Sequence, residues 1–227
     1  MEIEQIATIH TDFPEKFGLP RQSGLVAGLK GQIVMQPQFR SREAFRGLEE
    51  YSHIWVLWEF SQARRESWSP TVKPPRLGGN KRMGVFATRS PFRPNAIGMS
   101  ALKLDRIEYH AQLGPVLHVS GVDMLDGTPV YDIKPYLPYA DSYPEAMDGF
   151  AGRVRDKQLT VACPDKLLAK LQPEDQENVK QLLSQDPRTA YVDDPLRIWG
   201  LSYRQYNIRF RVDGVNADVL EIETCQK

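Results

Sequence analysis

Apolar and polar residues alternate, or β-branched and aromatic residues follow one another, in short stretches along the first two thirds of the chain. Such patterns are typical of half-buried and fully buried strands. The stretches expected to form strands are Ile3 to Thr11, Ile33 to Gln36, His53 to Phe60, Gly84 to Thr88, Met99 to Tyr109, Val116 to Val122 and Val130 to Ile133. Glycine- and proline-rich turns separate them, and only residues 42 to 48 favour a helix. This pattern predicts a closed barrel or a sandwich.

The last third of the chain has a different pattern. An acidic, turn-rich segment at residues 141–149 is the expected linker. Beyond it, Arg153 to Ala162 predicts a strand, Pro173 to Gln185 a helix, and Asn207 to Ile222 a hairpin that turns at Asp213-Gly214. We therefore expect a mainly β domain over residues 1–145 and a small α+β domain over residues 150–227.

Composition narrows the classes of protein that are possible. The 227 residues include 29 basic and 29 acidic ones, and 41% are hydrophobic, which suffices for a sizeable core. The longest apolar run, at residues 54–60, is far too short to span a bilayer, and the acidic N-terminus lacks a signal-peptide pattern. Cys163, Cys225 and four unclustered histidines show no metal-ligand spacing. We expect free thiols, no metal site and a cytoplasmic protein.

Positive charge is concentrated in one part of this neutral chain. From Ser67 to Leu104 there are seven Lys and Arg residues and no Asp or Glu, with Trp68, Phe86 and Phe92 interleaved. Residues 89–100 contain two prolines, which fix the backbone and exclude a helix interior or a central strand. A basic patch with aromatic residues is typical of a nucleic-acid-binding surface, and a solvated positive face is the alternative interpretation.

Familiar cofactor motifs are absent from the sequence. There is no Gly-x-Gly-x-x-Gly, no P-loop and no Gly-x-Ser-x-Gly elbow, which argues against ordinary Rossmann, P-loop and α/β-hydrolase chemistry. Three expected loop clusters instead combine glycine or proline with charged or amide groups: residues 17–24; residues 74–79 with 89–98; and residues 123–128 continuing into 132–136. If these clusters converge, they form a polar pocket with cationic, carboxylate and amide groups.

Several of these segments match a known family in the same order. They are Pro20-Arg21-Gln22, residues 74–79, Met83 to Ser90, Phe92 to Asn95, and Asp126 to Pro129 with Asp132 to Tyr136. On these residues the chain resembles the TsaA-like (TrmO-type) tRNA methyltransferases from about Ile6 to Leu137, and again at residues 185–191 and 206–212. One departure is Ala96, where the family often has a second proline, so this loop is expected to be slightly less stiff.

The resemblance implies a fold, a cofactor and an activity. It implies a small β-barrel with an appended C-terminal domain that binds S-adenosylmethionine without a Rossmann fold and acts as a homodimer. The expected reaction is methylation of N6 of N6-threonylcarbamoyladenosine at position 37 of threonine tRNA. The resemblance places the methyl donor against Pro20, Arg21, Gln22, Ser61, Gln62, Arg89, Met99, Asp123, Met124, Leu125 and Asp126. Either arginine could pair with the donor carboxylate, and Asp123 or Asp126 could hold its ribose or ammonium group.

Further residues receive roles in catalysis and in tRNA binding. Asp126 is the first choice for a general base, with Asp132 as the alternative, although both could simply stabilise turns. Lys134 or Tyr136 would bind the threonyl carboxylate, and Arg93 and Asn95 would position the base. The candidate contacts to tRNA phosphates are Arg76, Lys81, Arg82 and Arg93. The tail residues that could grip the anticodon stem or loop are Arg188, Tyr191, Arg204, Tyr206 and Arg209. A non-catalytic RNA-binding or adaptor module and a methyltransferase with another acceptor stay open.

Overall fold

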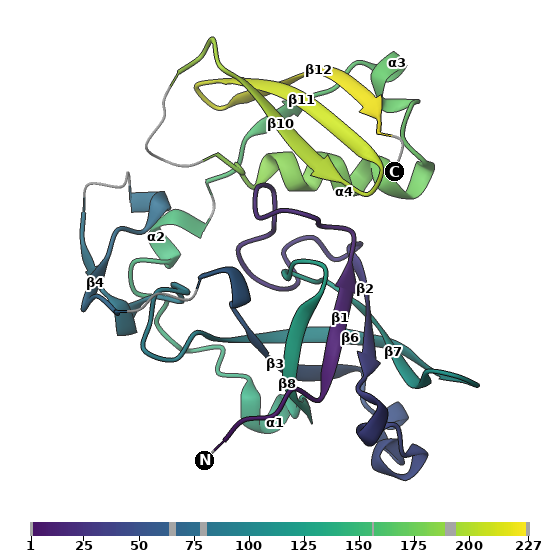
Figure 1. Cartoon of the computed structure of the whole chain (residues 1–227). Helices are drawn as coiled ribbons and strands as arrows, with labels where there is room; N and C mark the ends of the chain where they lie inside the picture. Colours follow the sequence, from purple (N-terminus) through teal and green to yellow (C-terminus); the bar gives the residue numbers. More distant parts are fainter. Residues whose placement is uncertain (1, 64–66, 78–80, 156, 189–193, 226–227) are drawn as a thin grey trace.

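Six strands form one closed barrel. The computed structural model describes residues 2–63, 67–77, 81–155, 157–188 and 194–225. The barrel strands are β1 (Ala7–Thr11), β2 (Lys30–Met35), β3 (His53–Glu59), β6 (Ile97–His110), β7 (Gly114–Ser120) and β8 (Thr128–Pro135). They follow the order β1-β2-β7-β6-β3-β8, and every neighbouring pair is antiparallel (Figure 1). The predicted mainly β fold with a barrel is confirmed, and closure leaves no unpaired strand edge.

The inward-facing side chains of alternate positions fill the barrel. Ile54, Val56 and Trp58 of β3 are buried there and lie against β6, where Trp58 is opposite Gly98 and Val56 is opposite Ser100. A Cβ atom on Gly98 would lie 2.3 Å from Cε2 of Trp58, so only glycine leaves room for the indole ring. The indole Nε1 donates a hydrogen bond of 2.9 Å to Ser100 Oγ, which satisfies the one polar atom of the ring.

The expected strand at Gly84 to Thr88 is wrong. Only Met83–Gly84 (β5) is extended, and it pairs with Thr71–Val72 (β4). The next residues, Val85–Ala87, form a 3₁₀ turn. Both the N–H and the hydroxyl of Thr88 donate to the Val85 carbonyl, and these bonds close the turn.

The expected helix at residues 42–48 is also absent. In its place are two 3₁₀ turns, η2 (Arg42–Phe45) and η3 (Leu48–Glu50), separated by Gly47 at φ +86°. Left-handed backbone at this glycine interrupts a continuous helix. The other short elements are η1 (Pro37–Phe39), η4 (Ser61–Ala63), η5 (Pro75–Leu77), η6 (Val85–Ala87), α1 (Pro138–Asp141), α2 (Gly152–Arg155) and α3 (Asp165–Leu168).

Three long connections meet at one end of the barrel, which we call the loop end. Strands β1, β3 and β7 run towards it and β2, β6 and β8 run away, because neighbours in the barrel are antiparallel. Residues 12–29, 60–96 and 121–127 therefore all connect strands at this end. The C-terminal domain lies on the same end (Figure 1). The topology thus gathers loops that are far apart in the sequence.

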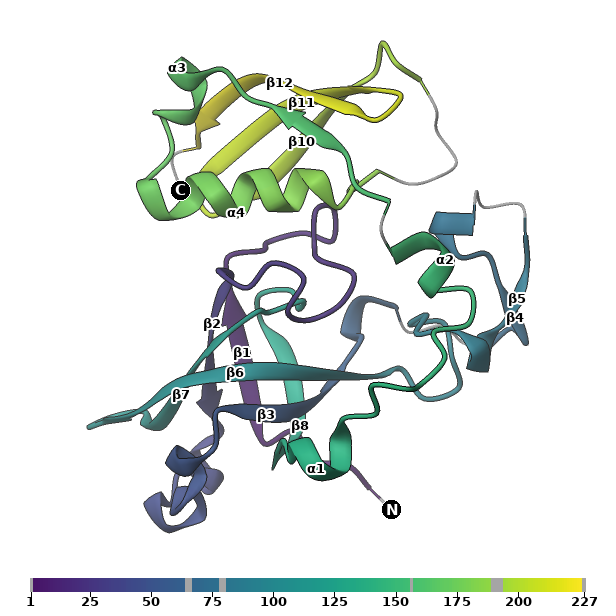
Figure 2. The same ribbon diagram turned by 180° about the vertical axis from the view of Figure 1, so that it is seen from behind.

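The C-terminal domain is a four-stranded sheet with a helix on one face. Its strands are β10 (Ile198–Tyr203), β11 (Tyr206–Asp213), β12 (Asn216–Thr224) and β9 (Thr160–Ala162), in that order. Helix α4 (Pro173–Ser184) covers the face towards the barrel (Figures 1 and 2). The predicted helix and the hairpin of β11 and β12 are confirmed. The predicted strand at Arg153 to Ala162 is wrong in its first half, where α2 lies.

Residues 12–29, which we call the junction loop, join the two domains into one core. The ring of Phe13 lies 5.6 Å from that of Tyr203, and Phe17 stacks on Trp199 at 5.8 Å. Arg204 Nε also pairs with Asp12 Oδ2 at 3.0 Å. Buried apolar residues of the barrel, the junction loop and the C-terminal domain form one cluster. The loop that bears three expected donor residues is therefore fixed by the C-terminal domain.

Replacing Gly18 with alanine should loosen this junction. Gly18 has φ +90°, and a Cβ atom there would lie 1.9 Å from Leu201 Cδ1. We expect a loss of about 2–4 kcal/mol in the free energy of unfolding, from backbone strain and overpacking together. Gly24→Ala is the matched control, because Gly24 has φ +77° and no atom within 4 Å of its Cβ position. Denaturant unfolding measures both, and equal losses would contradict a contribution from the Leu201 contact.

Candidate functional site

Gln22, Arg89 and Asp123 come from three different loops and lie together at the loop end. Arg89 Nη1 donates to Gln22 Oε1, which links the second and first loops. Asp123 follows β7, and its Oδ1 accepts a hydrogen bond of 2.7 Å from Ser100 Oγ in the barrel. The Asp123 carboxylate also accepts from the Ser23 backbone and lies within the field of Arg89. This cluster places a cation, an amide and a carboxylate side by side.

The electrostatics of Asp123 are unusual for an aspartate. Burial of the carboxyl group raises its pKa to about 6, and the Ser100 hydrogen bond, backbone hydrogen bonds and the Arg89 charge only partly offset this effect. The chain thus keeps a carboxylate in a place where its charge is poorly solvated. A ligand with a positive group beside Asp123 would favour the ionised form. Perturbed carboxyl groups of this kind are common at functional sites.

Arg21 has a different position from the one expected. Its Nη2 donates to the backbone carbonyls of Asp186, at 2.9 Å, and Arg188, at 3.5 Å. Both carbonyls belong to the segment after α4, so Arg21 ties the junction loop to the C-terminal domain. Arg89 is therefore the better-placed partner for a donor carboxylate. Among the other expected donor residues, Pro20 is buried, and the carbonyl of Gln62 accepts a 2.8 Å bond from Lys16 Nζ.

Asp126 lies in the turn that connects β7 to β8. Its Oδ1 accepts a hydrogen bond of 3.1 Å from the Thr11 N–H and lies 3.2 Å from His10 Nδ1. Its own N–H donates to the Phe13 carbonyl at 2.9 Å. About half of the Asp126 side chain is exposed (51%), and Oδ2 makes no hydrogen bond to the described part of the chain. One oxygen stabilises the turn, and the other is available for proton transfer.

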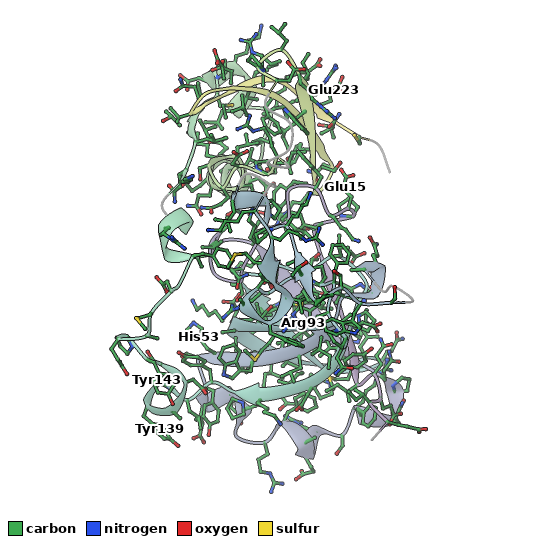
Figure 3. All side chains as sticks on the ribbon, turned by 90° about the vertical axis from the view of Figure 1, so that its left-hand side faces the viewer. Glu15, His53, Arg93, Tyr139, Tyr143 and Glu223 are labelled. Carbon is green, nitrogen blue, oxygen red and sulfur yellow. The ribbon has the colours of Figure 1, made fainter. Side chains whose placement is uncertain are left out.

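Three expected residues lie on β8 or just beyond it, away from the turn that holds Asp126. Lys134 Nζ pairs with Asp132 Oδ2 at 2.7 Å. Tyr136 donates its N–H to the His53 carbonyl, and its ring lies 5.5 Å from Trp55. His53 begins β3, so Tyr136 lies at the opposite end of the barrel from the Gln22, Arg89 and Asp123 cluster. Figure 3 shows Tyr139 and Tyr143 on the side away from the C-terminal domain.

The side chain of Met99 points away from the cluster, although the next residue, Ser100, bonds to Asp123. Met99 stands opposite Leu57 on the outward-facing side of β6, and half of it is exposed (51%). Ser61 is exposed immediately after β3. The backbone of Met124 and the side chain of Leu125 belong to the same turn as Asp123 and Asp126. The structure therefore brings together the Gln22, Arg89 and Asp123–Asp126 parts of the expected donor site.

The expected tRNA contacts fall in three places. Lys81 and Arg82 are exposed beside β5, where Arg82 Nε donates to Thr71 Oγ1 at 2.8 Å. Arg93 is half-buried, and its Nη1 donates to the Thr88 carbonyl at 3.1 Å, which braces the proline-rich loop. Arg188 is largely buried and pairs with Asp186 at 2.8 Å. Asn95 is exposed in the same proline-rich loop, whereas the Arg76 side chain and Tyr191 lie outside the described residues.

Comparison with known proteins identifies the family. Residues 8–142 match the tRNA-methyltransferase O N-terminal domain, and residues 156–225 match the TrmO C-terminal domain. The chain belongs to the TrmO family. The expected family, the barrel and the methyltransferase class are thereby confirmed.

Relatives of this TrmO chain match over most of its length. A tRNA (adenine(37)-N6)-methyltransferase from Escherichia coli (strain K12) is 40% identical over 98% of this chain and 97% of the relative. A candidate S-adenosylmethionine-dependent methyltransferase, RcsF, from Pseudomonas aeruginosa is 40% identical over 88% of this chain and 87% of its own length. The crystal structure of TrmO from P. aeruginosa superposes with a TM-score of 0.80 at 33% identity, covering 99% of this chain and 97% of that one.

The residues at the loop end of this TrmO chain fit S-adenosylmethionine as cofactor. The donor carries a sulfonium and an ammonium group, which are positive, and a carboxylate, which is negative. Arg89 offers a guanidinium for the carboxylate, and the poorly solvated Asp123 offers a carboxylate for a positive or hydroxyl group. Gln22 holds the position of Arg89. Arg89 and Asp123 thus supply one positive and one negative charge, which complement the negative and positive groups of the donor.

Donor affinity should rise with pH around the pKa of Asp123. Asp123 has a pKa of about 6 in the folded chain against 3.8 ordinarily, so the folded protein binds a proton more tightly. Its contribution to stability therefore falls as pH rises from about 4 to about 6, and stays level above. A positive donor group beside Asp123 favours the ionised form, so binding releases the proton. We expect donor binding to be about tenfold weaker at pH 5 than at pH 7.

Titration calorimetry in buffers of different ionisation enthalpy measures both the affinity and the released proton. Asp123→Asn should remove the pH step, because the variant carries no titrating carboxyl group. The Ser100 hydroxyl can still donate to the asparagine carbonyl oxygen, so the barrel contact is kept. An affinity in the wild-type protein that stays constant from pH 5 to pH 7 would contradict the proposed place of the donor.

Sequence reasoning missed Ser100 and Ser23 as supports of this site. Ser100 is a buried polar residue between inward-facing Gly98 and Leu102, and this break in the apolar pattern of β6 is a signal that the sequence contains. Ser23 contributes through its backbone, for which the sequence holds no signal.

Within the part of the chain that the structure describes, no group of three His, Cys, Asp or Glu residues could bind a metal. Across the same residues, no helix has the length and apolar character to cross a membrane.

Proposed function

We propose that this chain transfers a methyl group from S-adenosylmethionine to N6 of adenine 37 in tRNA, and that this adenine is the N6-threonylcarbamoyladenosine of threonine tRNA. The observation that carries the proposal is the cluster of Gln22, Arg89 and Asp123 at the loop end of a TrmO-family barrel. The E. coli relative, which aligns over 98% of this chain, is named for the adenine-37 reaction. The threonylcarbamoyl group and the tRNA identity follow from the resemblance of the sequence motifs.

Each residue at the loop end has a distinct part in this proposal. The donor, when bound, supplies a methyl group made electrophilic by its sulfonium. Arg89 binds the donor carboxylate, and Asp123 holds a positive or hydroxyl group of the same molecule. These two contacts orient the donor, and orientation provides much of the catalysis of a displacement reaction. The turn at Met124 and Leu125 supplies backbone groups and apolar contact for the adenine of the donor.

Asp126 acts on the acceptor. The N6 nitrogen forms a bond to the methyl group while the bond from methyl to sulfur breaks, and the sulfur keeps that electron pair. The N6 proton must then leave, and Oδ2 of Asp126 accepts it. The Thr11 N–H and His10 hold Oδ1, so the carboxylate is fixed in the turn while its other oxygen stays available. Asp132 is the alternative base, although its Oδ2 pairs with Lys134.

We propose that Lys134 or Tyr136 of a second copy of the chain binds the threonyl carboxylate, because within one copy both lie away from Asp126, and that Arg93 and Asn95 position the base. Lys81, Arg82 and the neighbouring aromatic pair Trp68 and Phe86, whose ring centroids are 6.1 Å apart, provide charge and stacking surface for RNA. These residues lie in or beside the segment that the sequence analysis found to lack acidic residues. Arg76, Arg188 and Tyr191 remain proposed contacts.

We also propose that the chain acts as a homodimer in the cytoplasm, where tRNA is available. The outward-facing side of β3, β6 and β8 supports this proposal. It exposes Ile97 and Met99 and continues into the exposed residues Tyr139, Tyr143 and Met147. Scattered apolar residues are ordinary on a surface, but Tyr139, Tyr143 and Met147 follow one another closely along the chain, in α1 and in the segment after it. Lys134 and Tyr136 border this face, so a second copy would lie close to them.

Methyl transfer to two pools of tRNA tests the proposed acceptor. The protein is incubated with labelled S-adenosylmethionine and either normal tRNA or tRNA that lacks the threonylcarbamoyl group. We expect label in the normal pool alone. Label in both pools would remove the carbamoyl group from the proposal, and donor binding without any labelling would indicate another acceptor. Absence of donor binding would leave a non-catalytic RNA-binding module.

A further inference from the structure

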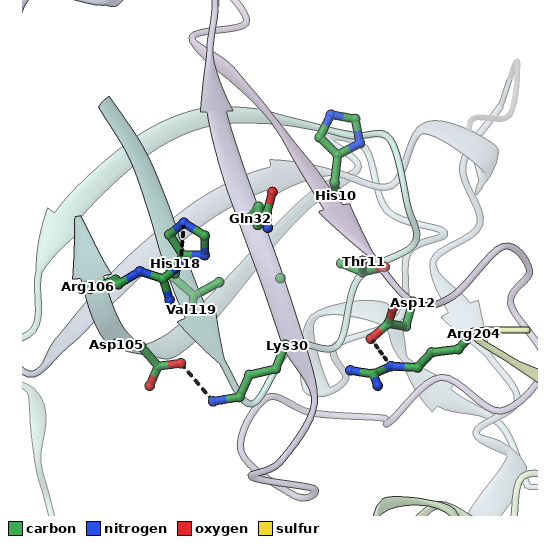
Figure 4. Close-up of a pocket in the computed structure, with 11 residues that line it drawn as sticks. His10, Thr11, Asp12, Lys30, Gln32, Asp105, Arg106, His118, Val119 and Arg204 are labelled. Atoms are coloured by element: carbon green, nitrogen blue, oxygen red, sulfur yellow. Dashed lines mark hydrogen bonds and ion pairs between the residues drawn. The ribbon is translucent and has the colours of Figure 1, made fainter. Parts of the chain in front are cut away.

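A second recess lies on the outside of the barrel, and among the residues of its floor only His10, which contacts Asp126, has a role above. It has a volume of about 400 Å³ and is bordered by β1, β2, β7 and the second half of β6. Arg204 of the C-terminal domain closes one edge (Figure 4). A volume of this size is within the range of small-molecule pockets and is sufficient for one nucleotide.

A row of polar side chains crosses the floor of this recess. His10 of β1 is opposite Gln32 of β2, Gln32 is opposite His118 of β7, and His118 is opposite Arg106 of β6. Their sequence neighbours Ile9, Ile33 and Leu117 are buried inside the barrel, so the row faces outward. Figure 4 shows Gln32 between the two histidines. The histidines, which are separated in the sequence, therefore line one site.

The recess is polar and carries charges of both signs. Lys30, Arg106 and Arg204 contribute three cations, and Asp12 and Asp105 contribute two carboxylates. Arg204 pairs with Asp12 at 3.0 Å and also with Glu174 and Asp175, and Arg106 pairs with Glu108 at 3.3 Å, so carboxylates offset both guanidinium groups. Lys30 Nζ pairs with Asp105 Oδ2 at 2.9 Å, and the same carboxylate group lies 3.9 Å from Lys103 Nζ. Two lysines therefore share one carboxylate beside Lys30, which suits a single phosphate group there, and apolar surface is contributed mainly by Val119.

Gln32 is the group best suited to read a base. It is exposed, and its side-chain amide makes no hydrogen bond within the described part of the chain. An amide presents donors and an acceptor together, as the edges of nucleobases do. The flanking imidazoles of His10 and His118 offer flat rings for contact with a base. Lys30 at the rim and a floor with an unused amide together match one nucleotide.

The recess adjoins the proposed reaction site. His10 belongs to its lining, and His10 Nδ1 lies 3.2 Å from Oδ1 of Asp126, the proposed general base. A strand whose target adenine reaches Asp126 therefore has its next nucleotide near this recess. The location favours a nucleotide of the same RNA over an unconnected ligand.

We propose that this recess binds one unpaired nucleotide that adjoins the methylated adenine, with its phosphate beside Lys30 and its base edge against Gln32. The proposal rests on the proposed function, because the RNA is the substrate. It assigns to His10, Gln32, Lys30, Arg106 and His118 a role that neither composition nor motif indicated.

Binding of threonine tRNA to three variants tests the proposal. Gln32→Ala removes the amide without breaking a contact of the described chain, and we expect about a three- to tenfold loss of tRNA affinity. Lys30→Gln removes one charge and should lower the slope of log affinity against log salt concentration by about one. Gln112→Ala is the matched control, because Gln112 is an exposed glutamine at the tip of the β6–β7 hairpin, remote from the recess. Affinity for S-adenosylmethionine should be unchanged in all three.

Free adenosine monophosphate and cytidine monophosphate serve as second probes. Wild-type tRNA affinity and salt slope in both Gln32→Ala and Lys30→Gln would overturn the proposal. Recess-dependent binding of the free nucleotides with unchanged tRNA binding would overturn it as well, and would define a small-molecule site. If the wild-type protein methylates no tRNA but Gln32→Ala still weakens tRNA binding, the result would support nucleotide binding in the recess. It would contradict the proposed function instead.

Discussion

Replacing Asp126 with asparagine should lower kcat by about 10²-fold or more, because the variant loses the basic oxygen that accepts the N6 proton. The substitution removes the basic oxygen and leaves the other contacts of the side chain in place. An asparagine carbonyl oxygen can still accept the hydrogen bond that the Thr11 N–H donates to Asp126 Oδ1 at 3.1 Å. The turn should therefore keep its shape, and the free energy of unfolding should change by no more than about 0.5 kcal/mol. Single-turnover methylation of tRNA measures the chemical step directly.

Asp132→Asn is the matched control for this variant. Asp132 is the alternative base, and its Oδ2 pairs with Lys134 Nζ at 2.7 Å. If Asp126 is the base, Asp132→Asn should keep a nearly normal rate of chemistry. Near-normal turnover of Asp126→Asn, together with unchanged affinity for the donor, would show that the general-base assignment is wrong. Weaker donor binding with a normal chemical step would place Asp126 against the donor instead.

Replacing Arg89 with alanine should weaken the binding of S-adenosylmethionine by roughly 10- to 100-fold. A hydrogen bond to a charged group contributes about 1.5–3 kcal/mol, and about 1.4 kcal/mol corresponds to a factor of ten. Arg89 donates to Gln22, so its loss also frees that amide from its present position. Titration calorimetry with S-adenosylmethionine measures the dissociation constant, and a saturating donor concentration should restore much of the rate.

Arg82→Ala separates donor binding from RNA binding. Arg82 is also an exposed arginine of the second loop, but it donates to Thr71 beside the β4–β5 pair. We expect unchanged donor affinity and a smaller salt dependence of tRNA binding in this variant. Equal weakening of donor binding by both substitutions would contradict the assignment of Arg89, because a general loss of positive charge would then explain the effect.

The sequence predicted the barrel because its strands carry local signals. Residues 53–60 are almost continuously apolar, and residues 99–109 alternate, so their strands β3 and β6 are found near the expected positions. The strand predicted at Gly84 to Thr88 is wrong because the apolar pattern there is typical of a strand, whereas the Thr88 hydroxyl donates to the Val85 carbonyl and closes a turn. Such a turn depends on a hydrogen bond between one hydroxyl and one carbonyl, and the pattern of hydrophobic residues gives no information about that bond.

The candidate site was predicted only in part, because some of its contacts join residues that are far apart in the sequence. Motifs in three loops pointed to Gln22, Arg89 and Asp123, and the antiparallel order of the barrel brings these loops to one end. Arg21 stands beside Gln22 in the same motif, yet it bonds to the carbonyls of Asp186 and Arg188, some 165 residues later. A contact between residues so far apart in the sequence depends on how the two domains pack together, which the local motif does not indicate.

The recess depends on register between strands in the same way. His10, Gln32 and His118 are separated by long stretches of sequence and become neighbours only through the pairing of β1 with β2 and of β2 with β7. A shift of one residue in either register would turn these side chains into the barrel. Sequence spacing alone therefore gave no indication that two of the four histidines share a site.

Mass spectrometry of the tRNA product tests the central claim most directly. Threonine tRNA that carries the threonylcarbamoyl group is incubated with the protein and S-adenosylmethionine, digested, and examined at position 37. The account predicts that this nucleoside gains one methyl group on its N6 nitrogen and that no other nucleoside changes. A methyl group on another nucleoside, or on the ribose of position 37, would contradict it.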